Sequence, residues 1–205
     1  MSGGAFLLLM QTDGPAAPWR WITVLEAAEQ ARVADEADHP YLDRLIADAA
    51  AYIEASAGLV PEPGERVVEL PGLRRVTPLH LAPVRAVAIE YRPPDGGAYV
   101  PLQSGWRLAR QSGRHVIVVD DPAALPAMAA APDAVRLTLQ VGPQTPQDAA
   151  LAPGGPGWLD LVRRAGLLLI GGWYDGRESS AAPVRAPVPH GVEVLLALAR
   201  RGVMA

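Results

Sequence analysis

Four segments of the chain carry apolar residues at three- and four-residue spacing, which is the periodicity of amphipathic helices. These segments are 23–33, 40–58, 158–175 and 189–201. In the first segment Thr23 precedes Glu26 by three residues, so each side chain can satisfy the free backbone N–H of the other. Pro40 suits the first turn of the second helix, and Gly58 is suited to end it. The pattern therefore predicts four helices.

The apolar faces of these helices predict a common core. The residues that we expect in it are Leu45, Ile46, Ile53, Leu169, Trp173 and Tyr174. The third helix is apolar nearly all round, so it should lie centrally among the others, and Gly166 would permit close approach of a neighbouring backbone. Trp173 continues the apolar stripe of this helix, so its truncation to alanine is expected to cost about 3 to 5 kcal/mol. The alternative for Trp173 is a partner contact.

Between the second and third helices the apolar period changes from about four to two, which is typical of strands. The expected strands begin near Arg66 and include 87–91, 106–109, 115–119 and 135–141, with a turn at 93–97. In 135–141 four apolar residues point to one side, as in a strand with one buried face. This pattern predicts a small antiparallel sheet in the middle of the chain.

The whole pattern predicts an α+β fold that is predominantly a helical bundle, with about four helices and a small antiparallel β insert. We expect five parts along the sequence. They are an N-terminal arm (1–20), a helical hairpin of the core (21–60), the β insert (61–142), a Gly/Pro-rich linker (143–156), and the C-terminal helices of the core with a docking tail (157–205).

Composition then narrows the function classes. All 18 basic residues among the 205 are arginine, which excludes lysine-dependent phosphate loops and Schiff-base chemistry. The chain has no cysteine, which removes disulfides and thiolate chemistry and agrees with a reducing compartment. A formal charge of -4 disfavours sequence-independent DNA binding unless arginines cluster. No apolar run approaches the ~20 residues of a membrane-spanning helix, so we expect no membrane segment.

Residues that could carry chemistry do not form a recognisable set. The four histidines lack metal-ligand spacing: His39, His80, His115 and His190. Asp120 and Asp121 are adjacent on an extended chain and point to opposite sides, so they cannot act as an acid/base pair. The glycines at 154–157 precede a helix as in a phosphate cradle, but no strand leads into them. We therefore predict no catalytic, cofactor-binding or metal-binding residues.

Several segments together resemble the head-tail connector (adaptor) family of long-tailed phages. They are Leu25-Glu26-Ala27-Ala28, the helix from Leu42 to Gly58, Pro83-Val84-Arg85-Ala86-Val87 with the turn Asp95-Gly96, and the stretch from Leu168 to Glu178. The resemblance covers roughly residues 20 to 201, and the segment from Trp173 to Glu178 is its most specific part. The chain departs from the family pattern at Gly172 and in its Pro/Gly-rich segment around 143–157.

The resemblance implies a structural, non-enzymatic subunit without a cofactor. Such subunits form a homo-oligomeric ring, usually of twelve copies, beneath the capsid portal protein. The ring extends the DNA channel, lets double-stranded DNA pass without tight binding, and receives a stopper or other tail-neck protein. The implied place is the neck of a virion or phage-like particle assembled in the bacterial host cytoplasm. The resemblance does not distinguish a phage from a prophage or a gene transfer agent.

Two regions are candidate interaction sites. Arg177 and Glu178, expected just past the third helix, would act between subunits or toward the portal, since a guanidinium fork gives geometric specificity. The alternative is a plain surface pair. The segment 183–205 would dock to the portal through its last helix. This helix has an apolar stripe and two arginines at its C-terminal end: Val192, Leu195, Leu196 and Ala199, then Arg200 and Arg201. The alternative is that this last helix folds back on the third helix.

Two rival functions remain open. A DNA-binding neck or tail factor would need Arg74-Arg75, Arg163-Arg164 and Arg200-Arg201 to converge on one face. A small nucleotide-binding enzyme would need a closed pocket at the glycines 154–157.

Overall fold

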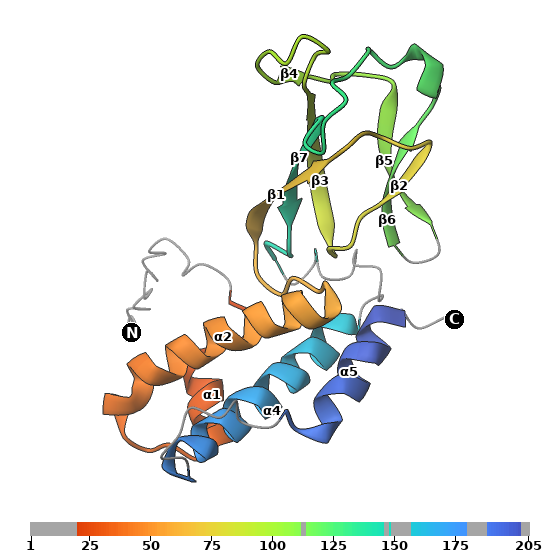
Figure 1. The fold of residues 1–205 in the computed structure, drawn as a ribbon. Helices are drawn as coiled ribbons and strands as arrows, with labels where there is room; N and C mark the ends of the chain where they lie inside the picture. The colour runs from red at the N-terminus through yellow and green to blue at the C-terminus, as the bar shows by residue number, and fades with distance from the viewer. Residues whose placement is uncertain (1–19, 112–113, 146–147, 149–156, 180–187, 202–205) are drawn as a thin grey trace, which may run out of the picture.

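The computed structural model describes residues 20–111, 114–145, 148, 157–179 and 188–201. Residues 1–19 of the predicted N-terminal arm, most of the linker 143–156 and the prolines at 183 and 187 lie outside these residues. In the described residues four α-helices form one layer and seven strands form a β body that stands on it (Figure 1). The α+β class and the number of helices match the prediction.

The helical layer is built from α1 (Val24–Ala31), α2 (His39–Ala57), α4 (Trp158–Ser179) and α5 (His190–Arg201). A short 3-10 helix, η1 (Glu36–Asp38), joins α1 to α2. The predicted capping box is confirmed, because Thr23 and Glu26 satisfy each other's backbone N–H groups. Pro40 lies in the first turn of α2, and Gly58 ends that helix in the left-handed conformation, φ 66°.

Helix α4 lies centrally, as predicted, since it packs against α1, α2 and α5. Gly166 allows the close approach on one side of α4. A Cβ placed there would lie 2.4 Å from a ring carbon of Trp21, so the neighbour that approaches is an indole ring rather than a backbone. The helix ends at Ser179, four residues beyond the predicted end near Asp175.

The β body contains two antiparallel sheets instead of the single small sheet that we expected. One sheet has the order β1-β7-β3-β4, from β1 (Gly64–Leu70), β7 (Val135–Val141), β3 (Val84–Tyr91) and β4 (Val100–Pro101). The other has the order β2-β6-β5, from β2 (Val76–Pro78), β6 (Arg114–Val119) and β5 (Trp106–Gln111). A 3-10 helix, η2 (Pro122–Ala124), follows β6. The prediction of a predominantly helical fold is therefore wrong, because two sheets make a substantial body.

Each layer has its own apolar core. In the β body the four alternate residues of β7 predicted to share one side are all buried: Val135, Leu137, Leu139 and Val141. They pack with side chains from the other sheet such as Ile117. In the helical layer Trp21, Trp158 and Ile53 are among the fully buried side chains. Burial of two separate apolar sets explains why the strands form a body beside the helices and do not become part of the bundle.

The two layers are joined at the C-terminal end of α2. After Gly58 the chain forms a parallel bridge between Leu59 and Ala82, in which the Ala82 N–H donates to the Gly58 carbonyl at 2.8 Å. Arg66 on β1 donates two hydrogen bonds to the Glu54 carboxylate on α2, from Nε at 2.7 Å and from a terminal nitrogen at 2.6 Å. This fork is a charge-assisted, bidentate pair that fixes one layer against the other.

Candidate interaction surfaces

The apolar stripe of α5 packs inside the subunit. Val192 and Leu196 are buried, Leu195 is partly buried, and α5 lies along α4. The structure thus shows the second alternative for this helix, in which it folds back on the third helix of the same subunit. These three side chains already have an apolar partner, so a docking role for the segment has to use other parts of it.

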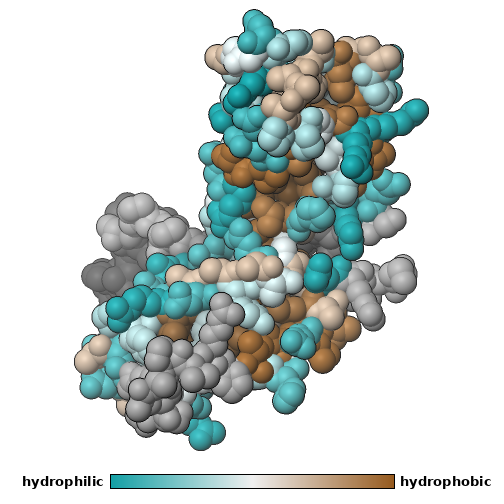
Figure 2. All heavy atoms as spheres, viewed as in Figure 1, coloured by the Kyte–Doolittle hydropathy of each residue, from teal (hydrophilic) through white to brown (hydrophobic). Residues whose placement is uncertain are grey.

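The outer surface of the helical layer carries large exposed apolar residues, of which the periodicity had identified only Leu168. They are Leu25 on α1 (67% exposed), Leu168 on α4 (36%), and Val194 and Leu198 on α5 (60% and 50%). Val194 and Leu198 are one helical turn apart, so they share a face. Figure 2 shows apolar surface on the part of the helical layer formed by α4 and α5. The spacing of Val194 and Leu198, four residues apart and outside the main apolar stripe, was the sequence signal that could have identified this surface.

The charged residues predicted for interaction are distributed over two helix ends. Arg177 and Glu178 belong to the last turns of α4, not to the segment after it, because the helix runs to Ser179. Their side chains, like that of Arg201 at the end of α5, lie outside the described part of the structure. Arg200 is exposed and reaches a hollow between the two layers. The interaction roles of these four residues remain predictions.

The predicted core residues differ in burial. Leu45, Ile46, Ile53 and Leu169 are buried in the helical layer. Trp173 and Tyr174 are only partly buried at its edge. The Trp173 ring meets Tyr52 edge-on at 6.1 Å, and the Tyr174 hydroxyl hydrogen-bonds with Asp38 at the start of α2. The cost of truncating Trp173 should therefore fall below the 3 to 5 kcal/mol expected for a fully buried ring.

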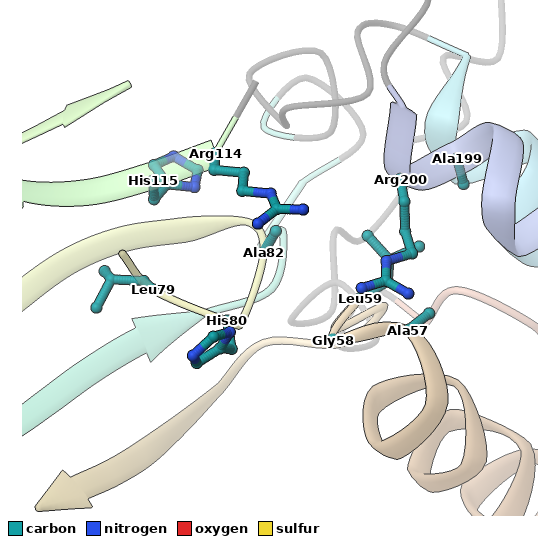
Figure 3. A pocket seen from close by; sticks show the side chains of 10 residues that line it. All are labelled: Ala57, Gly58, Leu59, Leu79, His80, Ala82, Arg114, His115, Ala199 and Arg200. Atoms are coloured by element: carbon teal, nitrogen blue, oxygen red, sulfur yellow. The ribbon is translucent and has the colours of Figure 1, made fainter. Parts of the chain in front are cut away.

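A small hollow lies where the helical layer meets the β body, with a volume of about 80 Å³. Four separate chain segments line it: the end of α2 with residues 57–59, the loop 79–82 after β2, the start of β6, and the end of α5. Figure 3 shows Arg114 and Arg200 reaching toward the hollow from β6 and α5, with His80 on the loop below. We call this hollow the basic pocket.

Positive charge in the basic pocket is not balanced within the described residues. Neither Arg114 nor Arg200 makes an ion pair in that part of the chain. His115 also lines the hollow, but burial, aided by the charge of Arg110, lowers its pKa to about 4. Its ring is therefore neutral near pH 7, and its Nδ1 accepts a 3.4 Å hydrogen bond from the backbone N–H of Val84. The pocket can attract an anion, but it has no arrangement for acid/base chemistry.

Other candidate sites are not supported by the described residues. These residues contain no group of three or more His, Cys, Asp or Glu side chains that could hold a metal ion. No helix in the described ranges is long and apolar enough to cross a membrane. Of the glycines at 154–157, only Gly157 lies within the structure's coverage. Arg163 pairs with Glu26, so one of the three arginine pairs considered for DNA is partly neutralised.

Comparison with known proteins gave matches only at the level of structure, since no family model and no curated protein sequence matches the chain. One similar structure is a chain in the neck of an empty gene transfer agent (GTA) particle computed with C6 symmetry. Its TM-score is 0.62 at 24% identity, over 87% of this chain and 89% of that one. A chain in the virion of a native GTA particle has the same TM-score at 23% identity, covering 90% and 91%.

A third match is a chain in the neck of a native GTA particle computed with C12 symmetry, with a TM-score of 0.55, 23% identity and coverage of 86% and 88%. All three matches span both the helical layer and the β body, because each covers at least 86% of the chain. The chain therefore shares its fold, over nearly its whole length, with chains of gene transfer agent particles.

Proposed function

We propose that this chain is a structural head-tail connector (adaptor) subunit in the neck of a phage-like particle of the gene transfer agent type. The observation that carries the proposal is the fold match to GTA chains, two of them neck chains, which includes both layers and leaves little of either chain unmatched. The sequence segments that resemble the connector family support the same role independently of the fold.

In this proposal copies of the chain form a ring, with twelve subunits as the expected number, beneath the portal protein. The ring extends the DNA channel and receives a stopper or other neck protein on its far side. The net charge of -4 is compatible with a channel through which DNA slides without tight binding. The exposed pair Val194 and Leu198 on α5 supports a protein-docking role for this helix, since exposed apolar side chains on one face favour a partner surface.

The test is assembly on the portal. Purified protein mixed with its portal should give a complex with a ring of extra density below the portal, seen by cryo-electron microscopy, and particles lacking the chain should keep filled heads without tails. Val194→Asp with Leu198→Asp should weaken portal or ring binding while the circular dichroism spectrum stays unchanged. Filled heads that still carry tails in the absence of this chain would refute the connector role.

A further inference from the structure

The basic pocket has no counter-charge among the residues that the structure describes. Arg114 and Arg200 come from different layers and reach the same hollow of about 80 Å³ (Figure 3). Like charges that share a small hollow repel each other, and an anion between them would turn that repulsion into attraction. Glu193 lies two turns before Arg200 on α5 but forms no ion pair with it in the described structure.

The remaining parts of the chain offer almost no acid to fill the pocket. The segments 112–113, 146–147, 149–156, 180–187 and 202–205 contain no aspartate or glutamate. Outside the described side chains, the acids are Asp13 in the N-terminal segment and Glu178 near the end of α4. Tyr174 of α4 bonds to Asp38, which places that end of α4 beside the start of α2, far from the pocket. A carboxylate from another molecule is therefore the better candidate.

Acidic residues gather at the opposite end of α2. Asp35 and Glu36, at the start of η1, are exposed, and Asp175 is exposed on the nearby last turns of α4. We call these three residues the acidic edge. Arg32 is also exposed there, and Arg177 and Glu178 lie on the same last turns of α4, so acidic residues outnumber arginines at this end of the helical layer. Helix α2 has 19 residues, so the acidic edge and the basic pocket are separated by about 28 Å along its axis.

We propose that the basic pocket of one copy receives the acidic edge of the next copy, which makes this the head-to-tail contact around the ring. The inference rests on the proposed ring function and adds the contact that closes the ring. Two different, complementary patches on one subunit give a heterologous interface, and such interfaces generate closed rings when the rotation between copies closes. A recessed hollow suits one carboxylate better than duplex DNA, whose charges repeat along an extended backbone.

Charge exchange tests the contact on full-length protein assembled with the portal. Arg114→Glu with Arg200→Glu, and separately Asp35→Arg with Glu36→Arg, should each lower the number of chains bound per portal at least several-fold, measured by mass photometry. The four substitutions together should restore binding. Arg75→Glu is the matched control, because Arg75 is exposed on the β body and does not line the pocket. Unchanged rings in both double variants would overturn the inference while leaving the connector function intact.

Cross-linking gives a second readout that does not depend on the strength of the charge pair. Because the chain has no cysteine, His80→Cys with Glu36→Cys introduces the only two thiols. A short bismaleimide should link neighbouring copies into a ladder of oligomers, whereas Gly72→Cys with Glu36→Cys, which moves one thiol away from the pocket, should not. Absence of the ladder in rings that form normally would contradict the proposed contact.

Duplex DNA is the competing occupant of the pocket. Fluorescence anisotropy at several salt concentrations should show no binding that depends on Arg114 and Arg200. If the wild-type chain binds duplex DNA with a steep salt dependence that Arg114→Glu with Arg200→Glu abolishes, the pocket is a phosphate site and the proposed contact is wrong. If the wild-type chain forms no ring with the portal at all, the proposed function fails first.

Discussion

Arginines at the two ends of the β body are in opposite electrostatic situations. At the end far from the helices, Arg92 and Arg136 both lie over the ring of Tyr99, at 4.9 Å and 3.8 Å from its centroid. Arg92 pairs with Asp133 at 2.6 Å, and Arg136 pairs with Glu69 at 3.1 Å. At the end that faces the helices, Arg114 makes no ion pair among the described residues, and neither does Arg200, which reaches it from α5.

This difference distinguishes Arg92 and Arg136, whose charges are neutralised inside the subunit, from arginines whose charges have no partner in the described residues. The charges of the cluster around Tyr99 are paired within one subunit, and the Tyr99 hydroxyl also donates a 2.8 Å hydrogen bond to the Asp133 carbonyl, although Arg92 Nε lacks a hydrogen-bond partner in the described structure. Charges that are paired in this way stabilise the body and offer little attraction to a charged ligand. At the junction with the helical layer Arg66 is paired with Glu54, whereas Arg114 and Arg200 have no ion pair among the described residues, so these two arginines remain available for assembly.

The largest expected effect tests whether the β body is as self-sufficient as its paired charges suggest. Trp158→Ala removes a fully buried ring from the helical core and should lower the free energy of unfolding by about 3 to 5 kcal/mol. Hydrogen exchange should then show faster opening of α4 than of β7. Trp173→Ala, at the half-buried edge, should cost clearly less. Equal loss of protection in α4 and β7 would show that the two layers open together.

The junction itself is sensitive at Gly58, where a substitution should distort the basic pocket. The left-handed φ of 66° disfavours other residues, and a Cβ would lie 2.1 Å from the His80 carbonyl oxygen. Gly58→Ala should therefore cost about 2 to 4 kcal/mol in a denaturant titration. Gly72→Ala, where no atom lies within 4 Å of the added Cβ, is the control and should be nearly neutral.

The third effect is a pH dependence of the folding stability that comes from His115, which lines the basic pocket. The pKa of His115 is lowered from 6.5 to about 4 in the folded chain, so between these values the unfolded chain binds a proton that the folded chain does not. Stability should be full above pH 6.5 and fall as the pH is lowered toward 4, by at most about 3 kcal/mol from this group. His115→Gln should remove that part of the decline in the melting temperature. An identical pH profile in the two proteins would contradict the assignment.

The smallest effect compares the two arginine environments directly. Arg92→Ala breaks an ion pair and a cation–π contact, so it should lower the unfolding free energy by about 1 kcal/mol. Arg114→Ala and Arg200→Ala should leave the melting temperature unchanged or slightly higher, because they remove charges without partners in the described structure. A clear loss of stability in Arg114→Ala would show that this charge is paired inside the subunit after all.

Local patterns predicted the elements better than their arrangement. The Thr23–Glu26 capping box, the end of α2 at Gly58 and the alternation in β7 are visible in short stretches of sequence, and the structure confirms them. The strand order could not be read in this way. β7 lies between β1 and β3 although 64 residues separate it from the end of β1 and 43 from the end of β3, and such pairings depend on the whole core.

The interaction surfaces were still harder to predict. Periodicity identified the stripe on α5 that contains Val192 and Leu196, but an apolar stripe looks the same whether it packs on its own subunit or on a partner. The basic pocket is lined by four chain segments spread from residue 57 to residue 200, so no short sequence pattern could predict it. Arg200 was singled out as one end of a docking helix, and its neighbours in space only became visible in the fold.

The fork between Arg66 and Glu54 has a mechanical consequence. It ties β1 to α2 on one side of the junction, and the bridge between Leu59 and Ala82 ties the segment before β3 to the end of α2. A tilt of the β body about α2 would have to stretch at least one of these ties. The subunit should therefore behave as one rigid body. A force applied to its sheets would be transmitted to its helices with little change in the angle between the two layers.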